Sequence, residues 1–508
     1  NLFNVLNFAC VSSNFSFSSL LKFKFNKLKV LLGTSIFTTS LFAASFLITP
    51  LALAEDNIVI PDLGPAGIRG MTVQAEKNYG EFFMRKANGA GAVTADPVLN
   101  EYIDTVGSKL IMNASNVYFP FEFFLSSDKS LNASAFLGGK VQVNAGLFHY
   151  TDNEDEFASV LAHEISHVTQ RHIARLIEAQ TDRTPVSVAS IIGSIVVALI
   201  NPTVGMAALS SSTGLLAQAG INFTRDNESE ADRVGLAVLA RAGYNPMAMS
   251  DLFKKLLAQQ GNINPAFSML VDHPLSEIRV AETYNLAKNM PKRQNSKNPN
   301  FMMAKARVDV RYMKYDLNSL KERLLNSRTV NTVYKNYALA LISLENKKFD
   351  EAASYLSKLN LPNNDFVLDV YTDIDIAQGR YQSAISRLKP IYDRKPNDGA
   401  ITLNLANAYV EGKQADGAIK VLTAFTRKHP NHALATDLLI KAYFQKKDKC
   451  NGFQTAAWNS VLSSNYNQAN GFLTDALHVC TGNDREIVRA KFKNYNYLRD
   501  FDAQFEKK

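Results

Sequence analysis

The pentapeptide His163-Glu164-Ile165-Ser166-His167 decides the fold of the first half of this chain. In an α-helix, residues four apart lie on one face, one turn apart, so His163 and His167 can bind the same metal ion. Glu164 lies about 100° further round the helix, where its carboxylate can accept a proton from a water molecule at the metal. The pentapeptide therefore predicts a helical metal site that catalyses hydrolysis.

The residues around the pentapeptide predict that this helix is buried. Thr151 and Glu154 have the spacing of an N-terminal capping box. An apolar stripe follows at helical spacing and consists of Phe157, Val160, Leu161, Ile165 and Val168. The pentapeptide can also arise by chance on a solvated helix. A buried imidazole without a polar partner is costly, however, so burial of the helix favours metal ligation.

A third metal ligand is expected downstream, because a catalytic zinc ion has three protein ligands and a water molecule. The best candidate is Glu228, in the charged stretch 225–233. On a helix, Asp232 lies on the same face one turn later and can hydrogen-bond a ligand imidazole. The alternative is a solvated charged helix. The upstream pentapeptide favours the metal site, with Glu164 and Asp232 as the residues that serve catalysis.

His163 to His167 followed by Glu228-x-x-Ala231-Asp232 resembles the gluzincin metallopeptidases related to the CAAX prenyl protease and the heat-shock membrane protease. Two further stretches narrow the resemblance, 132–139 (Asn-Ala-Ser-Ala-Phe-Leu-Gly-Gly) and 272–279 (Asp-His-Pro-Leu-Ser-Glu-Ile-Arg), as does the helical-repeat C-terminal half. Together they are similar to the periplasmic β-barrel assembly-enhancing proteases of Gram-negative bacteria. The resemblance implies one Zn²⁺ per chain and a mostly α fold with a small β-sheet, in which a gluzincin domain precedes an α-solenoid.

The resemblance also implies roles for two residues of the 272–279 stretch. His273 would occupy the fourth zinc position and hold the enzyme inactive until substrate moves its loop. Arg279 would stabilise the oxyanion or anchor that loop. From the residues alone, a surface histidine before Pro274 and a structural salt bridge of Arg279 remain alternatives. His149 and His172 match no ligand spacing and are interpreted as structural.

Two β-like runs precede the pentapeptide, at 117–125 and 140–143. In related gluzincins the second run is an edge strand beside the metal, and an unpaired edge can hydrogen-bond an extended peptide. The resemblance thus implies a substrate-binding edge strand that includes Gly138, Gly139, Val141 and Val143. A hairpin turn at the two glycines is the alternative, and both can hold.

The N-terminus reads as a secretory signal within residues 1–54. Lysines at 22–29 precede an apolar stretch at 30–48 and the small-residue site Ala52-Leu53-Ala54, after which we expect cleavage. The alternative is an uncleaved membrane anchor. Residues 1–20 begin with Asn rather than Met, which suggests a misassigned or truncated start. We therefore expect a periplasmic protein, with membrane association as the alternative.

The charge of the chain gives no support for nucleic-acid binding. The chain has 55 basic and 47 acidic residues, and four of the basic ones lie in residues 1–54, which hold no acid. The remaining net charge is +4, without a basic run interleaved with aromatics. Beyond Cys10 in the leader, only Cys450 and Cys480 remain, and an exported pair predicts one disulfide. Two unrelated buried thiols are the alternative.

An uncharged stretch lies between Thr184 and Thr224. It predicts a helical hairpin on the peptidase domain, either a buried core pair or a lid that contacts membrane or unfolded substrate. Residues 292–300 are polar and aperiodic, and predict either a linker or a long surface loop.

The C-terminal half repeats every 34 residues, as at Ala384 and Ala418 and at Tyr409 and Tyr443. This period resembles tetratricopeptide repeats and predicts about four helical pairs that form a concave groove, with 450–508 departing from the repeat. The expected organisation is a leader (1–54), a zinc metalloprotease domain (55–291), a linker (292–300) and a repeat domain (301–508).

The resemblance implies a periplasmic zinc endopeptidase with chaperone-like activity, which acts in outer-membrane β-barrel assembly and degrades misfolded or stalled precursors. The implied partners are unfolded or stalled outer-membrane proteins and the barrel assembly machinery, with peripheral membrane contact as a further expectation. The alternative is a non-proteolytic repeat chaperone or adaptor for the envelope assembly machinery.

Overall fold

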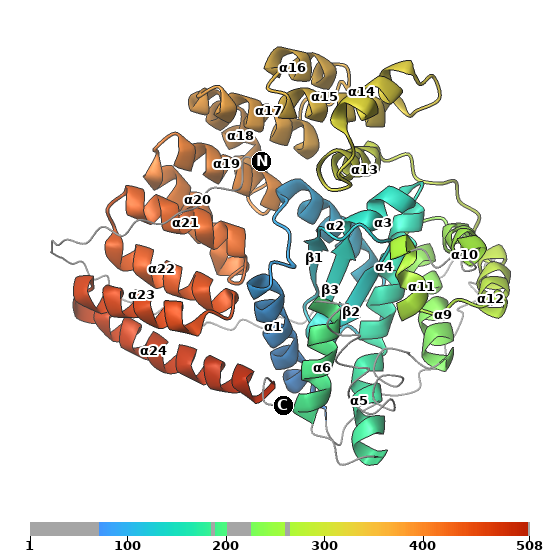
Figure 1. Cartoon of the computed structure of the whole chain (residues 1–508), viewed down its shortest axis with the longest axis horizontal. Coiled ribbons are helices and arrows are strands. Elements are labelled where there is room, and N and C mark those ends of the chain that lie inside the picture. The colour runs from blue at the N-terminus through green and yellow to red at the C-terminus, as the bar shows by residue number, and fades with distance from the viewer. Residues whose placement is uncertain (1–70, 184–187, 201–224, 260–264, 506–508) are drawn as a thin grey trace, which may run out of the picture. The chain divides into compact units, whose positions relative to one another are not determined.

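The computed structural model describes residues 71–183, 188–200, 225–259 and 265–505 (Figure 1). Most of these residues are helical and one three-stranded sheet is present among them, which confirms the predicted fold class. The leader, the segment 56–70 and residues 201–224 of the uncharged stretch lie outside the described residues. No helix in the described ranges is both long enough and apolar enough to cross a bilayer.

The N-terminal half of the described chain begins with two capped helices, α1 (Val73–Gly89) and α2 (Pro97–Ile111). The Thr72 side chain accepts a hydrogen bond from the first turn of α1. Asp96 caps α2 in the same way, and Pro97 stands at the first helical position, where its missing N–H costs nothing. These local signals explain where both helices start.

The sheet corrects the prediction of an edge strand at 140–143. Its strands are β1 (Glu122–Ser126), β2 (Ala133–Phe136) and β3 (Lys140–Asn144), in the order β1-β3-β2. β3, which carries Val141 and Val143, is therefore central, because β1 pairs with it in parallel and β2 pairs with it antiparallel. Gly138 and Gly139, with φ of 71° and 79°, form the turn of η1 (Leu137–Gly139) between β2 and β3. The outer strand beside the helix that carries the pentapeptide is β2. Residues 117–121, the first part of the predicted run 117–125, are not a strand.

The helix that carries the pentapeptide, α4 (Glu154–Thr169), follows α3 (Ala145–Tyr150). Its cap is Asn153, which accepts a hydrogen bond from the backbone N–H of Glu156, so the predicted Thr151–Glu154 capping box is wrong. The Thr151 hydroxyl instead donates to the Leu147 carbonyl at the end of α3. The predicted apolar stripe is buried throughout.

Several further described elements of the N-terminal half follow α4 in the chain. They are α5 (His172–Arg183), α6 (Val188–Ile200), α9 (Arg225–Arg241), α10 (Met247–Gln259), η2 (Pro265–Phe267), α11 (Met269–Asp272) and α12 (Glu277–Lys288). α9 packs along α4, while α6 packs on α1 through Ile191, Ile192 and Val196. The described part of the uncharged stretch is thus a core helix.

The predicted linker, residues 292–300, is held against the N-terminal half by hydrogen bonds. The Ser296 hydroxyl and the Asn298 amide donate to the Glu154 carboxylate at the start of α4. The next helix, α13 (Pro299–Arg311), carries Arg307, whose buried guanidinium donates to Asp96 at 2.7 Å and to Asp369 in the repeats at 2.6 Å. This ion-pair network joins both halves of the chain.

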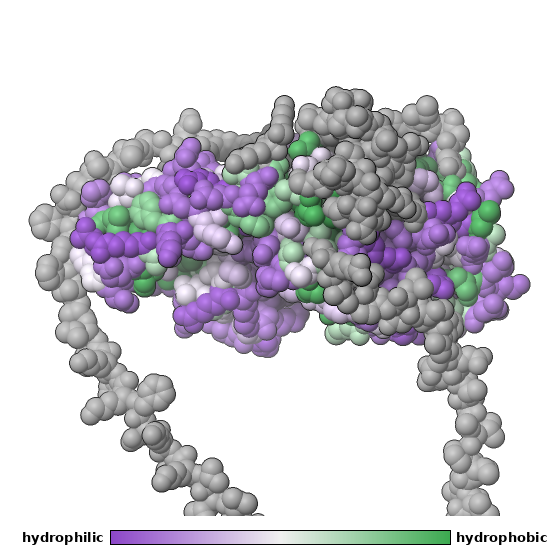
Figure 2. Space-filling view, turned by 90° about the horizontal axis from the view of Figure 1, so that it is seen from below, coloured by the Kyte–Doolittle hydropathy of each residue, from purple (hydrophilic) through white to green (hydrophobic). Residues whose placement is uncertain are grey.

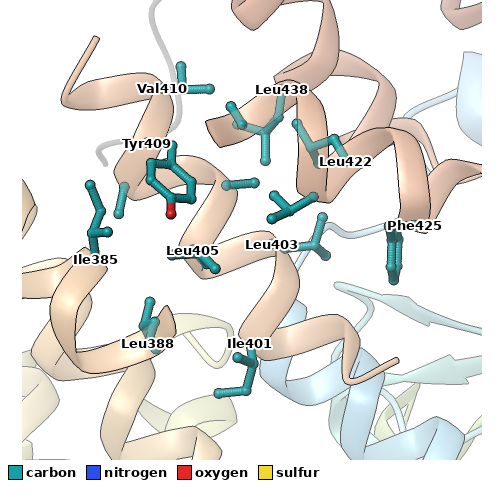
Figure 3. Close-up of a cluster of buried hydrophobic side chains, with 14 of the residues drawn as sticks. Ile385, Leu388, Ile401, Leu403, Leu405, Tyr409, Val410, Leu422, Phe425 and Leu438 are labelled. Atoms are coloured by element: carbon teal, nitrogen blue, oxygen red, sulfur yellow. The ribbon is translucent and has the colours of Figure 1, made fainter. Parts of the chain in front are cut away.

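After α14 (Leu317–Asn326), the repeats form five helical pairs, compared with the four expected. They are α15 (Thr332–Glu345) with α16 (Phe349–Ser357), α17 (Asp365–Ala377) with α18 (Tyr381–Arg394), α19 (Gly399–Glu411) with α20 (Ala415–Lys428), α21 (Ala433–Gln445) with α22 (Lys449–Leu462), and α23 (Tyr466–Val479) with α24 (Gly482–Asp502), followed by η3 (Ala503–Phe505). The alternation continues beyond residue 450, where the sequence pattern had faded. Leu403, Leu405 and Leu422 belong to the core between successive pairs (Figure 3).

A disulfide links Cys450, in the first turn of α22, to Cys480 after α23. Cys480 is buried among apolar side chains of α22, α23 and α24. The disulfide and the buried cores therefore hold these helices together.

Where described residues are visible in Figure 2, the face is mostly hydrophilic, with hydrophobic side chains scattered among the polar ones.

Candidate metal centre

The centre forms where α4 and α9 cross closely. His163 and His167 come from α4 and Glu228 from the first turn of α9, and all three side chains are buried. At Gly235 a Cβ would lie 3.1 Å from the Ala162 carbonyl and from the His163 backbone nitrogen. The glycine thus permits the helix approach that brings the glutamate to the histidines.

Four donor groups converge at this crossing. His163, His167, Glu228 and His273 each contribute one ligand atom, and these atoms lie within 4.8 Å of one another. The Nε2 atoms of His163 and His167 are 3.0 Å apart, and each lies 3.5 Å from a Glu228 oxygen. His273 Nδ1 is 3.0 Å from Glu228 Oε1. Imidazoles and one carboxylate are the ligands that zinc prefers, so these residues fit a metal ion.

Asp232 and Arg279 lie behind His163. Asp232 Oδ1 is 3.0 Å from His163 Nδ1, which leaves Nε2 facing the other ligands. The Arg279 guanidinium donates to both Asp232 oxygens, at 2.7 and 2.9 Å, and to the Pro274 carbonyl at 2.7 Å. It also lies 3.0 Å from Glu228 Oε2. These contacts are those of a residue that anchors the His273 loop.

His172 contacts His167, an arrangement that the sequence reasoning missed. Its Nδ1 is 2.8 Å from His167 Nδ1, and its Nε2 is 3.1 Å from Glu230. Arg175 donates to the same Glu230 oxygen at 2.8 Å. Glu230 was the one sequence signal for this contact. It lies in the charged stretch 225–233, in which only Glu228 and Asp232 were assigned roles. His149, by contrast, pairs with Asp309 away from this centre.

Glu164 lies between the ligand group and the outer strand. Its Oε2 accepts a hydrogen bond of 2.9 Å from the Ala135 backbone N–H, and its Oε1 lies 3.4 Å from His273 Nε2. In an antiparallel pair alternate residues turn their backbone groups outward, so Ala133 and Ala135 on β2 face away from β3. The Asn132 amide donates to Asp272 at 2.7 Å, which ties this strand to the His273 loop.

The electrostatics of the centre favour a cation. Burial opposes ionisation of Glu228, yet the charge of His273 and hydrogen bonds from His163 and His273 hold the pKa of this carboxyl below its usual range. Burial alone would lower the pKa of His163, but Asp232 and Glu228 raise it to about 10. Burial also lowers the pKa of His167, with the charge on His163 adding to the effect. An ionised, buried Glu228 needs positive partners, and Arg279, a protonated histidine and a metal ion can each serve as one.

For Glu164, burial raises the pKa above the ordinary value, while the positive charges of His273 and His163 oppose this shift. A carboxyl with a raised pKa is suited to exchange protons near neutral pH. The geometry and the charge of the site therefore point to the same chemistry, hydrolysis at a metal.

Comparison with known proteins agrees with this geometry. Residues 97–287 match the model of peptidase family M48, and residues 375–441 match a tetratricopeptide repeat. The chain is 38% identical over 424 residues to the β-barrel assembly-enhancing protease of Yersinia pestis, covering 82% of this chain and 87% of that protein. The chain belongs to this family of M48 peptidases.

Two further relatives match this chain over different lengths. The β-barrel assembly-enhancing protease of Escherichia coli K12 is 36% identical over 431 residues, which cover 84% of this chain and 88% of that protein. The mitochondrial metalloendopeptidase OMA1 of Schizosaccharomyces pombe is 28% identical over 179 residues, or 35% of this chain and 50% of that protein. As a member of this family the chain is a metalloendopeptidase, and the group of His163, His167, Glu228 and His273 lies inside the M48 match.

The close helix crossing makes a first prediction. Gly235→Ala should force α4 and α9 apart, cost about 1–3 kcal/mol of unfolding free energy, and weaken Zn²⁺ binding, because Glu228 and the histidines lie on opposite sides of the contact. Chemical denaturation and chelator competition measure the two effects. The matched control is Gly471→Ala on α23, where the new methyl meets nothing within 4 Å. Wild-type stability and metal affinity in Gly235→Ala would contradict the role of the crossing.

Proposed function

We propose that this chain is a periplasmic zinc endopeptidase that acts in outer-membrane β-barrel assembly and degrades misfolded or stalled precursors. The observation that carries the proposal is the buried ligand group beside Glu164 and the outer strand β2. The names of the relatives in Yersinia pestis and Escherichia coli support the biological setting. The secretory signal expected in residues 1–54 supports the periplasm.

We assign the metal to His163, His167 and Glu228, with one zinc ion per chain. Zinc bound there would polarise the scissile carbonyl and make a nucleophile available at neutral pH. Asp232 and His172 orient the two ligand imidazoles by accepting their Nδ1 protons. Glu164 accepts the proton of the attacking water and returns it to the leaving amine.

The substrate would bind as an added strand along β2. The outward backbone groups of Ala133 and the outward carbonyl of Ala135 can pair with an extended peptide, while the Ala135 N–H donates to Glu164 and holds this carboxylate at the strand edge. This arrangement places the scissile bond beside the proton acceptor. It requires only main-chain hydrogen bonds, which suits a protease of unfolded proteins.

The division of the chain follows from the same proposal. Residues 55–291 would form the peptidase domain, 292–300 its connection, and 301–508 the repeats that select unfolded outer-membrane proteins or contact the assembly machinery. The five stacked pairs support a recognition role, because repeat arrays offer extended binding surfaces. The same observation favours a second function, a chaperone or adaptor that works without cleavage.

Replacing the proton acceptor separates these functions. Glu164→Gln should lower kcat for an unfolded protein substrate by about 10²- to 10⁴-fold while zinc content stays the same. Glu282→Gln, which alters an exposed carboxylate on α12, is the control. Peptidase activity is measured on purified protein, and barrel assembly in cells. Full barrel assembly by Glu164→Gln would make the adaptor function the principal one.

The outer strand is tested with proline. Ala133→Pro removes an outward N–H and leaves the ladder to β3 intact, so KM for an extended peptide should rise about fivefold, the effect of ~1 kcal/mol from one lost hydrogen bond. Ala133→Gly keeps the N–H and serves as the control. Equal KM values for the two variants would exclude strand addition along β2.

We further propose that His273 holds the resting enzyme inactive as a fourth ligand. His273→Ala should raise kcat/KM and weaken zinc binding, because the fourth position opens while one ligand is lost. His478→Ala, at an exposed histidine of α23, is the control. Unchanged activity on a protein substrate would remove the inhibitory role.

A further inference from the structure

Helix α1 contacts both the last repeats and the surroundings of the metal centre. In Figure 1 it lies between the red helices α22 to α24 and the sheet. α1 packs on α22 at one side and on η1 and α6 at the other. Neither the ligand chemistry nor the repeat period requires a helix in this position.

The C-terminal end of α1 is joined to the last repeat by a buried ion pair. Arg85 donates to both oxygens of Asp502, at 3.0 and 2.5 Å, and the Tyr466 hydroxyl donates to the same carboxylate. The side chains of Arg85 and Asp502 are 9% and 2% exposed. Phe501 and Phe505 continue the contact by packing against the rings of Tyr79 and Phe82. The end of α24 is thus fastened to α1.

A second buried ion pair joins the N-terminal end of α1 to Arg171, which lies just beyond the end of α4. Arg171 donates from Nε to Glu76 at 2.8 Å and to the Met71 carbonyl at 2.6 Å. Arg171 has φ of 55°, a left-handed conformation that costs energy for any residue with a side chain. It follows Gln170, the C-cap of α4, so its conformation turns the chain and directs His172 back onto His167.

Between these two ends, α1 lies directly against the turn after β2. A Cβ at Gly80 would lie 2.4 Å from the Leu137 carbonyl, and one at Gly138 would lie 2.8 Å from the Glu76 carbonyl. Backbones this close move together, because no side chain can rearrange to absorb a shift. A displacement of α1 therefore reaches the end of the outer strand as well as Arg171.

Two buried ion pairs are a poor way to increase stability, because desolvation offsets most of the attraction. These ion pairs instead fix the position of α1, since each can form only when α1 lies in one particular place. We propose that α1 couples the last repeat to the metal centre, with Asp502 and Arg85 at one end and Glu76 and Arg171 at the other as positioning residues. A partner that displaces α24 then loosens the Arg171 turn, the contact between His172 and His167, and the binding of metal.

This inference rests on the proposed metal site. The test below separates failure of the metal site from failure of the coupling. Asp502→Asn in the full-length protein should weaken Zn²⁺ binding about fivefold or more in chelator competition. The control is Asp500→Asn, an exposed carboxylate on the same helix, which should bind zinc as the wild type does. If the wild type itself binds no zinc, the proposed metal site fails. If it binds zinc and Asp502→Asn binds equally well, the coupling fails.

A double-mutant cycle distinguishes coupling from general destabilisation. Arg171→Gly permits the left-handed turn but removes the ion pair with Glu76. In this background Asp502→Asn should have less than about half of its effect on zinc affinity, because the route to His167 is already broken. Equal effects in both backgrounds would overturn the proposal, even if Asp502→Asn also lowers the melting temperature.

Coupling free energies are reciprocal, which provides a readout independent of activity. Added Zn²⁺ should slow amide exchange of residues 482–502 in the wild type and leave it unchanged in Arg171→Gly. If Zn²⁺ does not change the amide exchange rate of residues 482–502 in the wild type, the coupling is overturned. If circular dichroism shows that Asp502→Asn loses helix, Tyr466→Phe replaces it, since that change removes a single hydrogen bond to Asp502.

Discussion

The close contact between α4 and α9 is the constraint on which the rest of the structure depends. The ligands of the centre come from two helices about sixty residues apart in the chain, and Gly235 allows the backbones to approach until a carboxylate reaches two imidazoles. Every other polar group of the centre is arranged around this crossing. Asp232 reaches His163 because it lies one turn beyond Glu228 on α9, and Glu230 reaches His172 from the same helix.

Because this crossing is buried, the charged groups in it need partners of opposite charge. Glu228 is ionised in an interior where an isolated charge would be costly, so histidines, Arg279 and a metal ion are its means of stabilisation. Arg279 has a second function, since its hydrogen bond to the Pro274 carbonyl places His273 within reach of Glu228. The same guanidinium thus contacts both Glu228 and the loop that carries His273.

The repeats are not an independent appendage of this centre. Arg307 joins the cap of α2 to Asp369 in the repeats, and Arg85 joins α1 to Asp502 at the end of the last repeat. Both guanidinium groups are buried, so separation of the two halves would leave unpaired charges. Regulation through the repeats is therefore expected to involve small displacements of packed helices rather than free domain motion.

The sequence alone determined the features that depend on local periodicity. Histidines four apart on an apolar helix predict a metal site, and a 34-residue period predicts paired repeat helices, because both follow from the geometry of a single helix. Tertiary structure decided what distant segments do to one another. β3 became the central strand because β1, the β-like run that precedes it in the chain, pairs with its other side, and Glu122 lies opposite Lys140 in that register. His172 gained its role from the left-handed turn at Arg171, which is held by Glu76 from another helix. No periodicity encodes such contacts, since their free energy appears only when the separate segments are packed together.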